Sequence, residues 1–213
     1  NVDGIVQGLQ RLTGSGKPEV IVTYDLAAPS GFPTSVTPPV TQLVVPAPTS
    51  VIALFSQNII VQGHDGDELP FPEARWADTI PSLTQARIVQ GFENAGYMKV
   101  ATTEDDLTAD FKLAIDFREF RITTSPAPPV ADVEFSAKLF DADGKMVDAN
   151  VFSGTAPVSV TNDSAVAATA LDEAFDKAAT DLIVWALTTL TASPQGPGAA
   201  SPYPRRAPSH ALA

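Results

Sequence analysis

The segment between Arg75 and Gly96 is the part of the sequence that most restricts the fold. Thr79 or Asp78 is placed to cap a helix, and Pro81 falls in its first turn, where a missing N–H costs nothing. Gly96 can adopt the left-handed conformation that ends a helix. The apolar side chains between these signals recur at helical spacing: Leu83, Ala86, Ile88, Phe92 and Ala95. The segment therefore predicts an amphipathic helix at about residues 79–96, packed across a sheet because strand-like segments lie on both sides.

A second helix is indicated at about residues 163–190. Asn162 or Asp163 is placed to cap it, since either side chain can accept a hydrogen bond from a first-turn N–H. Its apolar stripe follows steps of four, three, four and three: Leu171, Phe175, Ala178, Leu182 and Trp185. The face that we expect to be wet carries Asp172, Glu173, Asp176 and Asp181. This spacing is more typical of a core helix than of a partner-binding groove.

Alternation of apolar and polar residues predicts strands in much of the remaining chain. The longest is residues 110–123, where apolar side chains alternate with Lys112, Ala114, Asp116 and Arg118. The alternation slips by one residue near Arg118–Glu119, and a β-bulge there would absorb the slip. The other predicted strands are residues 19–26, 42–45, 58–62, 69–75, 97–102, 133–139 and 146–153, whereas residues 50–55 fit neither pattern.

Two turns and the composition of both chain ends complete the predicted organisation. Asp65-Gly66 and the turn that contains Gly144 are typical hairpin signals. Residues 1–18 are interpreted as a flexible N-terminal spacer and residues 192–213, rich in proline, as a disordered tail. The prediction is thus one α/β domain at residues 19–191, a mixed β-sheet with two main helices packed on it.

Composition excludes several classes of function. The net charge of −12 argues against a nucleic-acid partner, because phosphate-backbone binding needs a basic surface. The chain has no cysteine, so it has no disulfide, thiolate metal site or cysteine nucleophile. No run approaches the roughly 18 apolar residues that span a bilayer.

Catalytic and metal-binding patterns are weak as well. The histidines are His64, in a predicted turn, and His210, in the predicted tail, and neither position offers a rigid partner for a nucleophile. The side chains of His64, Asp65, Asp67 and Glu68 are crowded into one turn, where they cannot easily converge on one ion. We therefore expect no enzyme, no cofactor and no metal site, although paired carboxylates of a hydrolase are not excluded by sequence.

The order of short motifs resembles the ABC-type transport auxiliary lipoprotein family. The motifs are Tyr24–Leu26, Gln42–Pro48, Ala74–Asp78, Phe92–Asn94, Asp110–Phe120, Ser136–Leu139 and Leu182–Trp185. Their order and spacing match over roughly Val20 to Leu190. The segment from Arg75 to Asp78, followed by the helix end at Phe92–Asn94, is the most specific part of the resemblance.

The resemblance implies a function as well as an α/β fold. Members of this family are lipoproteins of the periplasm, anchored to the outer membrane through an N-terminal lipidated cysteine. They assist an inner-membrane ABC transporter and its mammalian-cell-entry type substrate-binding protein in moving lipids across the Gram-negative envelope. Because this chain has no cysteine, we expect the modified cysteine to lie just before Asn1. Residues 2–18 would then be a leash that reaches roughly 20–25 Å.

Two questions stay open at the level of sequence. The chain is either this non-catalytic accessory lipoprotein or a periplasmic module that itself carries a lipid or another small molecule. The sequence also leaves open whether the protein forms homo-oligomers. Arg75, Trp76 and Asp78 are candidate partner contacts, since exposed Arg and Trp often form binding hot spots. The alternative, which we favour for Trp76, is that this side chain is buried and packs the first helix onto the sheet.

Overall fold

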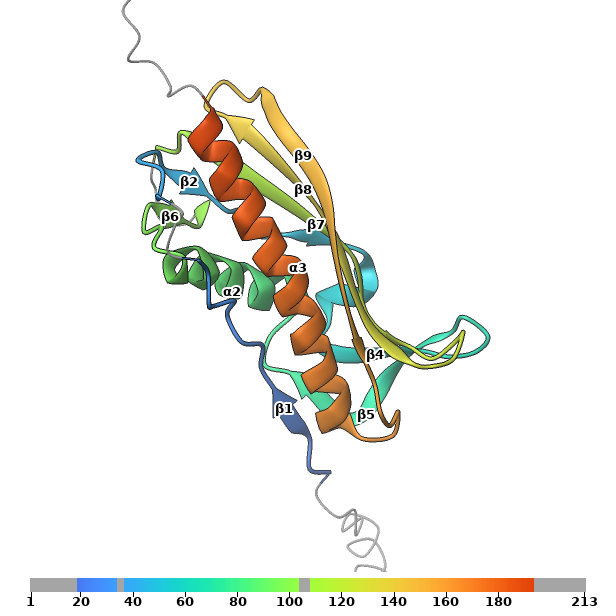
Figure 1. The fold of residues 1–213 in the computed structure, drawn as a ribbon. Coiled ribbons are helices and arrows are strands. Elements are labelled where there is room, and N and C mark those ends of the chain that lie inside the picture. The colour runs from blue at the N-terminus through green and yellow to red at the C-terminus, as the bar shows by residue number, and fades with distance from the viewer. Residues whose placement is uncertain (1–18, 34–36, 104–107, 194–213) are drawn as a thin grey trace, which may run out of the picture.

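The computed structural model describes residues 19–33, 37–103 and 108–193, which form a curled mixed sheet with two long helices on one face (Figure 1). The strands are β1 (Val22–Tyr24), β2 (Leu43–Val44), β3 (Thr49–Ser50), β4 (Asn58–Gln62), β5 (Glu68–Trp76), β6 (Val100–Ala101), β7 (Phe111–Thr123), β8 (Val130–Asp141) and β9 (Met146–Pro157). The helices are η1 (Ile52–Phe55), α2 (Ile80–Asn94) and α3 (Ser164–Ala192). The α/β class predicted from sequence is confirmed. The predicted spacer, residues 1–18, and the tail beyond residue 193 lie outside the described residues.

Strand β7 is the centre of the sheet. It pairs antiparallel with β8 and parallel with β2, β3 and β4, while β9 pairs antiparallel with β8. Strands β4 and β5 are antiparallel across the predicted Asp65-Gly66 turn, where Gly66 has a φ of +82°. The second predicted hairpin joins β8 to β9, and Gly144 in its turn has a φ of +79°. Both turns need a left-handed residue, which glycine supplies without a steric penalty.

The predicted bulge in β7 is confirmed. The register against β8 shifts between Phe117, which opposes Phe135, and Glu119, which opposes Glu134. Before the bulge the odd-numbered side chains are buried, and after it Phe120 and Ile122 are buried. The extra residue therefore keeps the apolar side chains of both halves on the face that packs against the helices.

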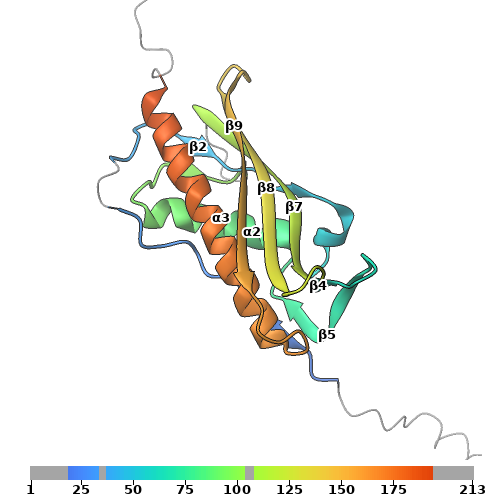
Figure 2. The same cartoon turned by 45° about the vertical axis from the view of Figure 1, so that its right-hand side comes forward.

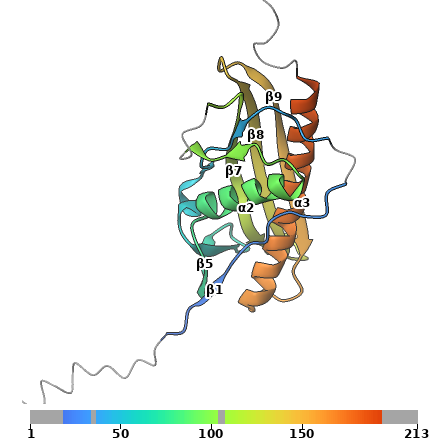
Figure 3. The same cartoon turned by 90° about the vertical axis from the view of Figure 1, so that its left-hand side faces the viewer.

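The core lies between the sheet and the two helices: in Figure 3, α2 crosses in front of β7 and β8, and α3 runs alongside β9. The predicted apolar stripe of α3 is confirmed: its members from Leu171 to Leu182 are fully buried, and Trp185 is partly buried. In α2 one predicted core residue is wrong, because Ala86 is exposed. The buried positions there include Thr84, whose hydroxyl donates to the Ile80 carbonyl.

The helix ends follow the sequence signals with two differences. Thr79 is the N-cap of α2, but its side chain makes no capping hydrogen bond, whereas Asp163 caps α3 by accepting from the N–H groups of Ala165 and Val166. Gly96 has a φ of +87° just after α2, as predicted. Helix α3 runs to Ala192, so the predicted boundary at residue 190 is two residues too early.

Several predicted strands are shorter than expected. Only Val22–Tyr24 of residues 19–26 pairs with the sheet, because the partner strand β5 ends at Trp76 opposite Tyr24. Only Val100–Ala101 of residues 97–102 is a strand, paired with β2. The ambiguous residues 50–55 form the end of β3 and the short helix η1. These short strands depend on partners far along the chain, which periodicity does not reveal.

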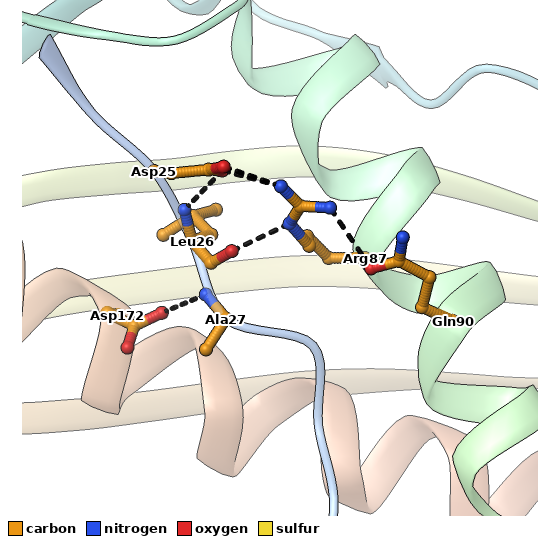
Figure 4. A network of polar contacts seen from close by, with 6 residues as sticks. All are labelled: Asp25, Leu26, Ala27, Arg87, Gln90 and Asp172. Atoms are coloured by element: carbon orange, nitrogen blue, oxygen red, sulfur yellow. Dashed lines mark hydrogen bonds and ion pairs between the residues drawn. The ribbon is translucent and has the colours of Figure 1, made fainter.

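A polar network ties the segment after β1 to both helices (Figure 4). The guanidinium of Arg87 on α2 donates to both carboxylate oxygens of Asp25 at 2.8 and 2.7 Å, and its Nε donates to the Leu26 carbonyl at 2.6 Å. One residue later, the N–H of Ala27 donates to Asp172 of α3 at 2.7 Å. The pairing with Arg87 lowers the pKa of Asp25, while burial raises the pKa of Asp172.

Candidate functional site

Trp76, one of the three residues suggested by sequence, is part of the core. Its side chain is 1% exposed, and its ring meets that of Phe120 edge to face at a centroid distance of 5.8 Å. Trp76 is the last residue of β5 and belongs to the same buried core as Ile80 and Leu83 of α2. Trp76 is therefore buried, as the packing interpretation expected, and its ring is not available as a partner contact.

Arg75 and Asp78 lie on the surface on either side of Trp76. The Nε of Arg75 donates to the Thr23 hydroxyl across the β1–β5 pair at 3.3 Å. The carboxylate of Asp78 accepts from the N–H of Thr79 at 2.7 Å, next to the first turn of α2. Both side chains are exposed, so they stay candidates for a partner contact.

A groove on the other face of the sheet was not predicted from sequence. It lies over β7, β8 and β9 on the side turned away from α2 and α3, and its volume is ≈ 700 Å³. We call it the outer-face groove. It is lined by Pro46, Ala47, Thr49, Lys112, Ala114, Ile115, Asp116, Arg118, Ser136, Ala137, Lys138, Ala149, Asn150 and Val151. Figure 2 turns this face of β7–β9 toward the viewer's right.

Short side chains in adjacent strands make the groove hollow. Ala114 of β7 opposes Lys138 of β8, which in turn opposes Ala149 of β9. One row further along, Ser136 lies between Asp116 and Val151. Because directly opposed residues on one face are near neighbours, Ala114, Ala149, Val151 and Ser136 surround Lys138 and leave a shallow floor around it.

The wall of the groove is the segment between β2 and β3. Val44 pairs with Lys112 and Thr49 pairs with Asp116, so this segment advances five residues while β7 advances four. The extra residue, together with Pro46 in the same segment, lifts the chain out of the ladder, since proline has no N–H to donate. The Thr49 hydroxyl donates to the Asp116 carboxylate at 2.5 Å, which fastens the wall to the sheet.

The groove is cationic although the whole chain is acidic. Three cations and one carboxylate line it, a net charge of +2, whereas the formal charge of the chain is −12. The Nζ of Lys112 lies 5.2 Å from the centroid of the Phe140 ring. Arg118 pairs with Glu134 at 3.3 Å in an exposed contact, and Lys138 makes no hydrogen bond or ion pair within the described part of the chain. The positive charge is therefore only weakly neutralised.

The same sheet face is acidic beyond the bulge. Arg121 pairs there with Glu68 at 2.5 Å and with Glu119 at 2.6 Å. Burial raises the pKa of Glu119 and the pKa of Asp132, an effect that the nearby Arg121 opposes. The outer face is thus divided into a cationic half, which holds the groove, and an acidic half.

The turn at His64 does not form a metal centre. The Nδ1 of His64 lies 3.2 Å from the Ser125 hydroxyl, and Glu68 is engaged by Arg121. Across residues 19–33, 37–103 and 108–193, no group of three or more His, Asp or Glu side chains is arranged to hold a metal ion. Within the same ranges, no helix is both long enough and apolar enough to cross a membrane.

Comparison with known proteins supports the motif resemblance. Residues 24–182 match the family of ABC-type transport auxiliary lipoprotein components. An uncharacterized protein from Bradyrhizobium diazoefficiens is 35% identical over 185 residues, which cover 86% of this chain and 50% of that protein. The chain therefore spans about half the length of this curated relative.

Solved structures agree on the fold. A protein from Xanthomonas campestris of the DUF330 family is 29% identical, with a TM-score of 0.71 over 79% of this chain and 95% of that one. A hypothetical protein from Chlamydia trachomatis has a TM-score of 0.52 over 72% of this chain and 99% of that one, at 9% identity, which supports the fold alone. The chain belongs to the family of ABC-type transport auxiliary lipoprotein components.

Proposed function

We propose that this protein is a non-catalytic accessory lipoprotein in the periplasm of a Gram-negative cell, serving an ABC transport system of the mammalian-cell-entry type that moves lipids. The observation that carries the proposal is the family match, which extends from β1 into α3 and so covers the sheet and both long helices. The likeness to the Xanthomonas campestris structure over most of its length supports the same assignment.

Membrane attachment in this proposal comes from an N-terminal lipid anchor on the outer membrane. The described chain begins beside β1, and α3 ends at the opposite end of the molecule (Figures 1 and 2). A domain held near β1 would present the far end, with β2, β6 and the end of α3, toward the periplasm. Fractionation of host cells tests the location: the protein is expected with outer membranes and released by detergent, and recovery without detergent contradicts the anchor.

The proposed partner is the substrate-binding protein of the transporter. Arg75 and Asp78 are the proposed contacts, because both are exposed next to the packed Trp76, which holds the backbone between them in place. Exposed charges of this kind steer association and weaken with added salt.

Co-purification from the native host tests the partner directly. The tagged protein should retain the mammalian-cell-entry type protein at low salt, and the double variant Arg75→Glu, Asp78→Lys should lose most of it. Lys145→Glu, in the β8–β9 turn, is the control for a change of surface charge. Absence of this partner at both low and high salt would refute the proposed system, while retention by the double variant would refute only these contacts.

A second candidate function is carriage of a lipid or another small molecule by the domain itself. The outer-face groove favours this candidate, because it offers a concave surface with an apolar floor. Native mass spectrometry of protein purified from its own host separates the two functions. A stoichiometric lipid on the purified protein supports carriage, and its absence supports an accessory role.

A further inference from the structure

The outer-face groove has the shape and lining of a site for a small amphipathic molecule. Its volume of ≈ 700 Å³ lies within the range of roughly 300–1,000 Å³ that is usual for ligand sites. The floor is built from Ala114, Ala149 and Val151, with Pro46 and Ala47 in the wall. These side chains can bury hydrocarbon but cannot form a hydrogen bond.

The charged groups stand around this floor. Lys138 opposes Ala114 and Ala149 across the two strand pairs, so its ammonium group rises from the middle of the apolar surface. Lys112 and Arg118 lie on β7 at opposite ends of the groove lining. Asp116 is the carboxylate in the lining, and the hydrogen bond from Thr49 occupies part of its accepting capacity.

The free state leaves these cations poorly compensated. Lys138 has no polar partner among the described residues. In the Arg118–Glu134 pair, the arginine side chain is 48% exposed and the glutamate side chain 36%. Because an exposed ion pair contributes little to stability, Arg118 can readily exchange Glu134 for another anion. An anionic group would therefore gain charge-assisted hydrogen bonds without displacing a strong contact.

We propose that the outer-face groove binds an anionic amphiphile, with the acyl chain on the alanine and valine floor and the phosphate or carboxylate beside Lys138 and a neighbouring cation. The proposal rests on the second candidate function, carriage by the domain itself, since it names the chemical class of lipid that the domain would carry. It assigns this recognition to Lys112, Arg118 and Lys138.

An acidic peptide fits the groove less well. Extended peptides usually bind by adding main-chain hydrogen bonds at the edge of a sheet. The groove lies over the face of the β7–β8–β9 ladder and reaches the edge strand β9, but its centre is over β8, whose backbone groups already pair on both sides. A peptide there would leave its own backbone groups without partners, whereas an acyl chain has none to satisfy.

Binding is tested with three probes at concentrations below micelle formation. The probes are lysophosphatidic acid, lysophosphatidylcholine with the same acyl chain, and inorganic phosphate, each followed by isothermal titration calorimetry and native mass spectrometry. We expect one molecule of lysophosphatidic acid per chain, with binding at least tenfold weaker for the zwitterionic lipid and for phosphate alone. Equal binding of both lipids overturns the role of the cations, and equal binding of phosphate overturns the role of the floor.

Matched variants locate the site. Lys138→Glu should weaken lysophosphatidic acid binding by at least tenfold, and Lys145→Glu, the same change outside the groove lining, should leave it unchanged. Ala114→Trp should block the floor with a similar loss. Thermal unfolding of each variant shows whether it is folded, and a folded Lys138→Glu or Ala114→Trp protein that binds like the unaltered protein overturns the assignment.

The co-purification described above separates this inference from the proposed function. Loss of lipid binding in Lys138→Glu with the transporter partner retained supports the groove assignment and the transporter partner together. If the unaltered protein retains the partner but binds no lysophosphatidic acid, only the groove assignment fails. If an acidic peptide displaces lysophosphatidic acid and binds more tightly than this lipid does, the groove is a peptide site and the inference is overturned.

Discussion

Replacing Gly154 with alanine tests the closest approach between α3 and the sheet. A Cβ atom at this position of β9 would lie 2.0 Å from the Ala174 carbonyl oxygen, 3.0 Å from its carbonyl carbon and 3.2 Å from the Ala178 nitrogen. All three are backbone atoms, so no side-chain rotation relieves the clash and the helix must move. Overpacking of a core usually costs about 1–3 kcal/mol, and we expect the upper end, about 3 kcal/mol, because Ala174 and Ala178 are fully buried.

Urea unfolding followed by circular dichroism measures the change in the free energy of unfolding. For a domain of this size the loss corresponds to a fall in Tm of roughly 6–12 °C. Gly63→Ala is the matched control, since its added Cβ has the Asp67 carbonyl oxygen at 3.8 Å as its nearest neighbour, an ordinary contact. If Gly154→Ala and Gly63→Ala unfold within about 0.5 kcal/mol of each other, the close packing of α3 on β9 is wrong.

Three further predictions concern polar contacts. Arg87→Ala should lower the free energy of unfolding by about 1–2 kcal/mol in urea unfolding, because it removes the hydrogen bonds to Asp25 and to the backbone after it; an unchanged midpoint would contradict this. Burial raises the pKa of Asp172 above its value of 3.8, so the folded state binds this proton more tightly and stability falls as pH rises through the raised pKa. Asp172→Asn keeps an acceptor oxygen, so Tm should rise at pH 7 and change less as the pH falls from 7 to about 3.8, the ordinary pKa of the group; a Tm profile parallel to that of the unaltered protein would exclude this cause. Asp148→Ala removes the acceptor of the Trp185 indole N–H, at 3.1 Å, and should shift the tryptophan emission while costing less than about 1 kcal/mol.

The parts of the fold that sequence predicted are those encoded over neighbouring residues. Helix α3 repeats its apolar side chains at helical spacing, and apolar and polar side chains alternate along β7 up to the bulge. Both elements could therefore be predicted without knowing the segments that they pack against. The hairpin glycines belong to the same group, because Gly66 and Gly144 are needed for the local backbone angle. Strand β3 left no periodic signal, whereas β2 and β6 lie inside the predicted strands 42–45 and 97–102. Each has only two residues, because its extent depends on pairing with distant segments, which periodicity does not show.

The candidate site was less predictable than the fold. Sequence placed Lys112, Ala114, Asp116 and Arg118 on one face of β7, but it did not show what stands beside them. The groove depends on the register that sets Ala114 and Ala149 on either side of Lys138, and one residue of slip would remove it. The burial of Trp76 likewise depends on Phe120, which only the folded sheet brings into contact.

The bulge in β7 makes one position in the sheet tolerant of a change in chain length. Phe117 opposes Phe135 and Glu119 opposes Glu134, consecutive residues of β8, so removal of Arg118 would leave a continuous ladder. Phe120 and Ile122 would still point toward the helices after such a deletion. A deletion between Phe111 and Ile115 would instead turn the apolar side chains on its N-terminal side away from the core. Related chains can therefore gain or lose the charge at this position in a single step while the interior stays intact.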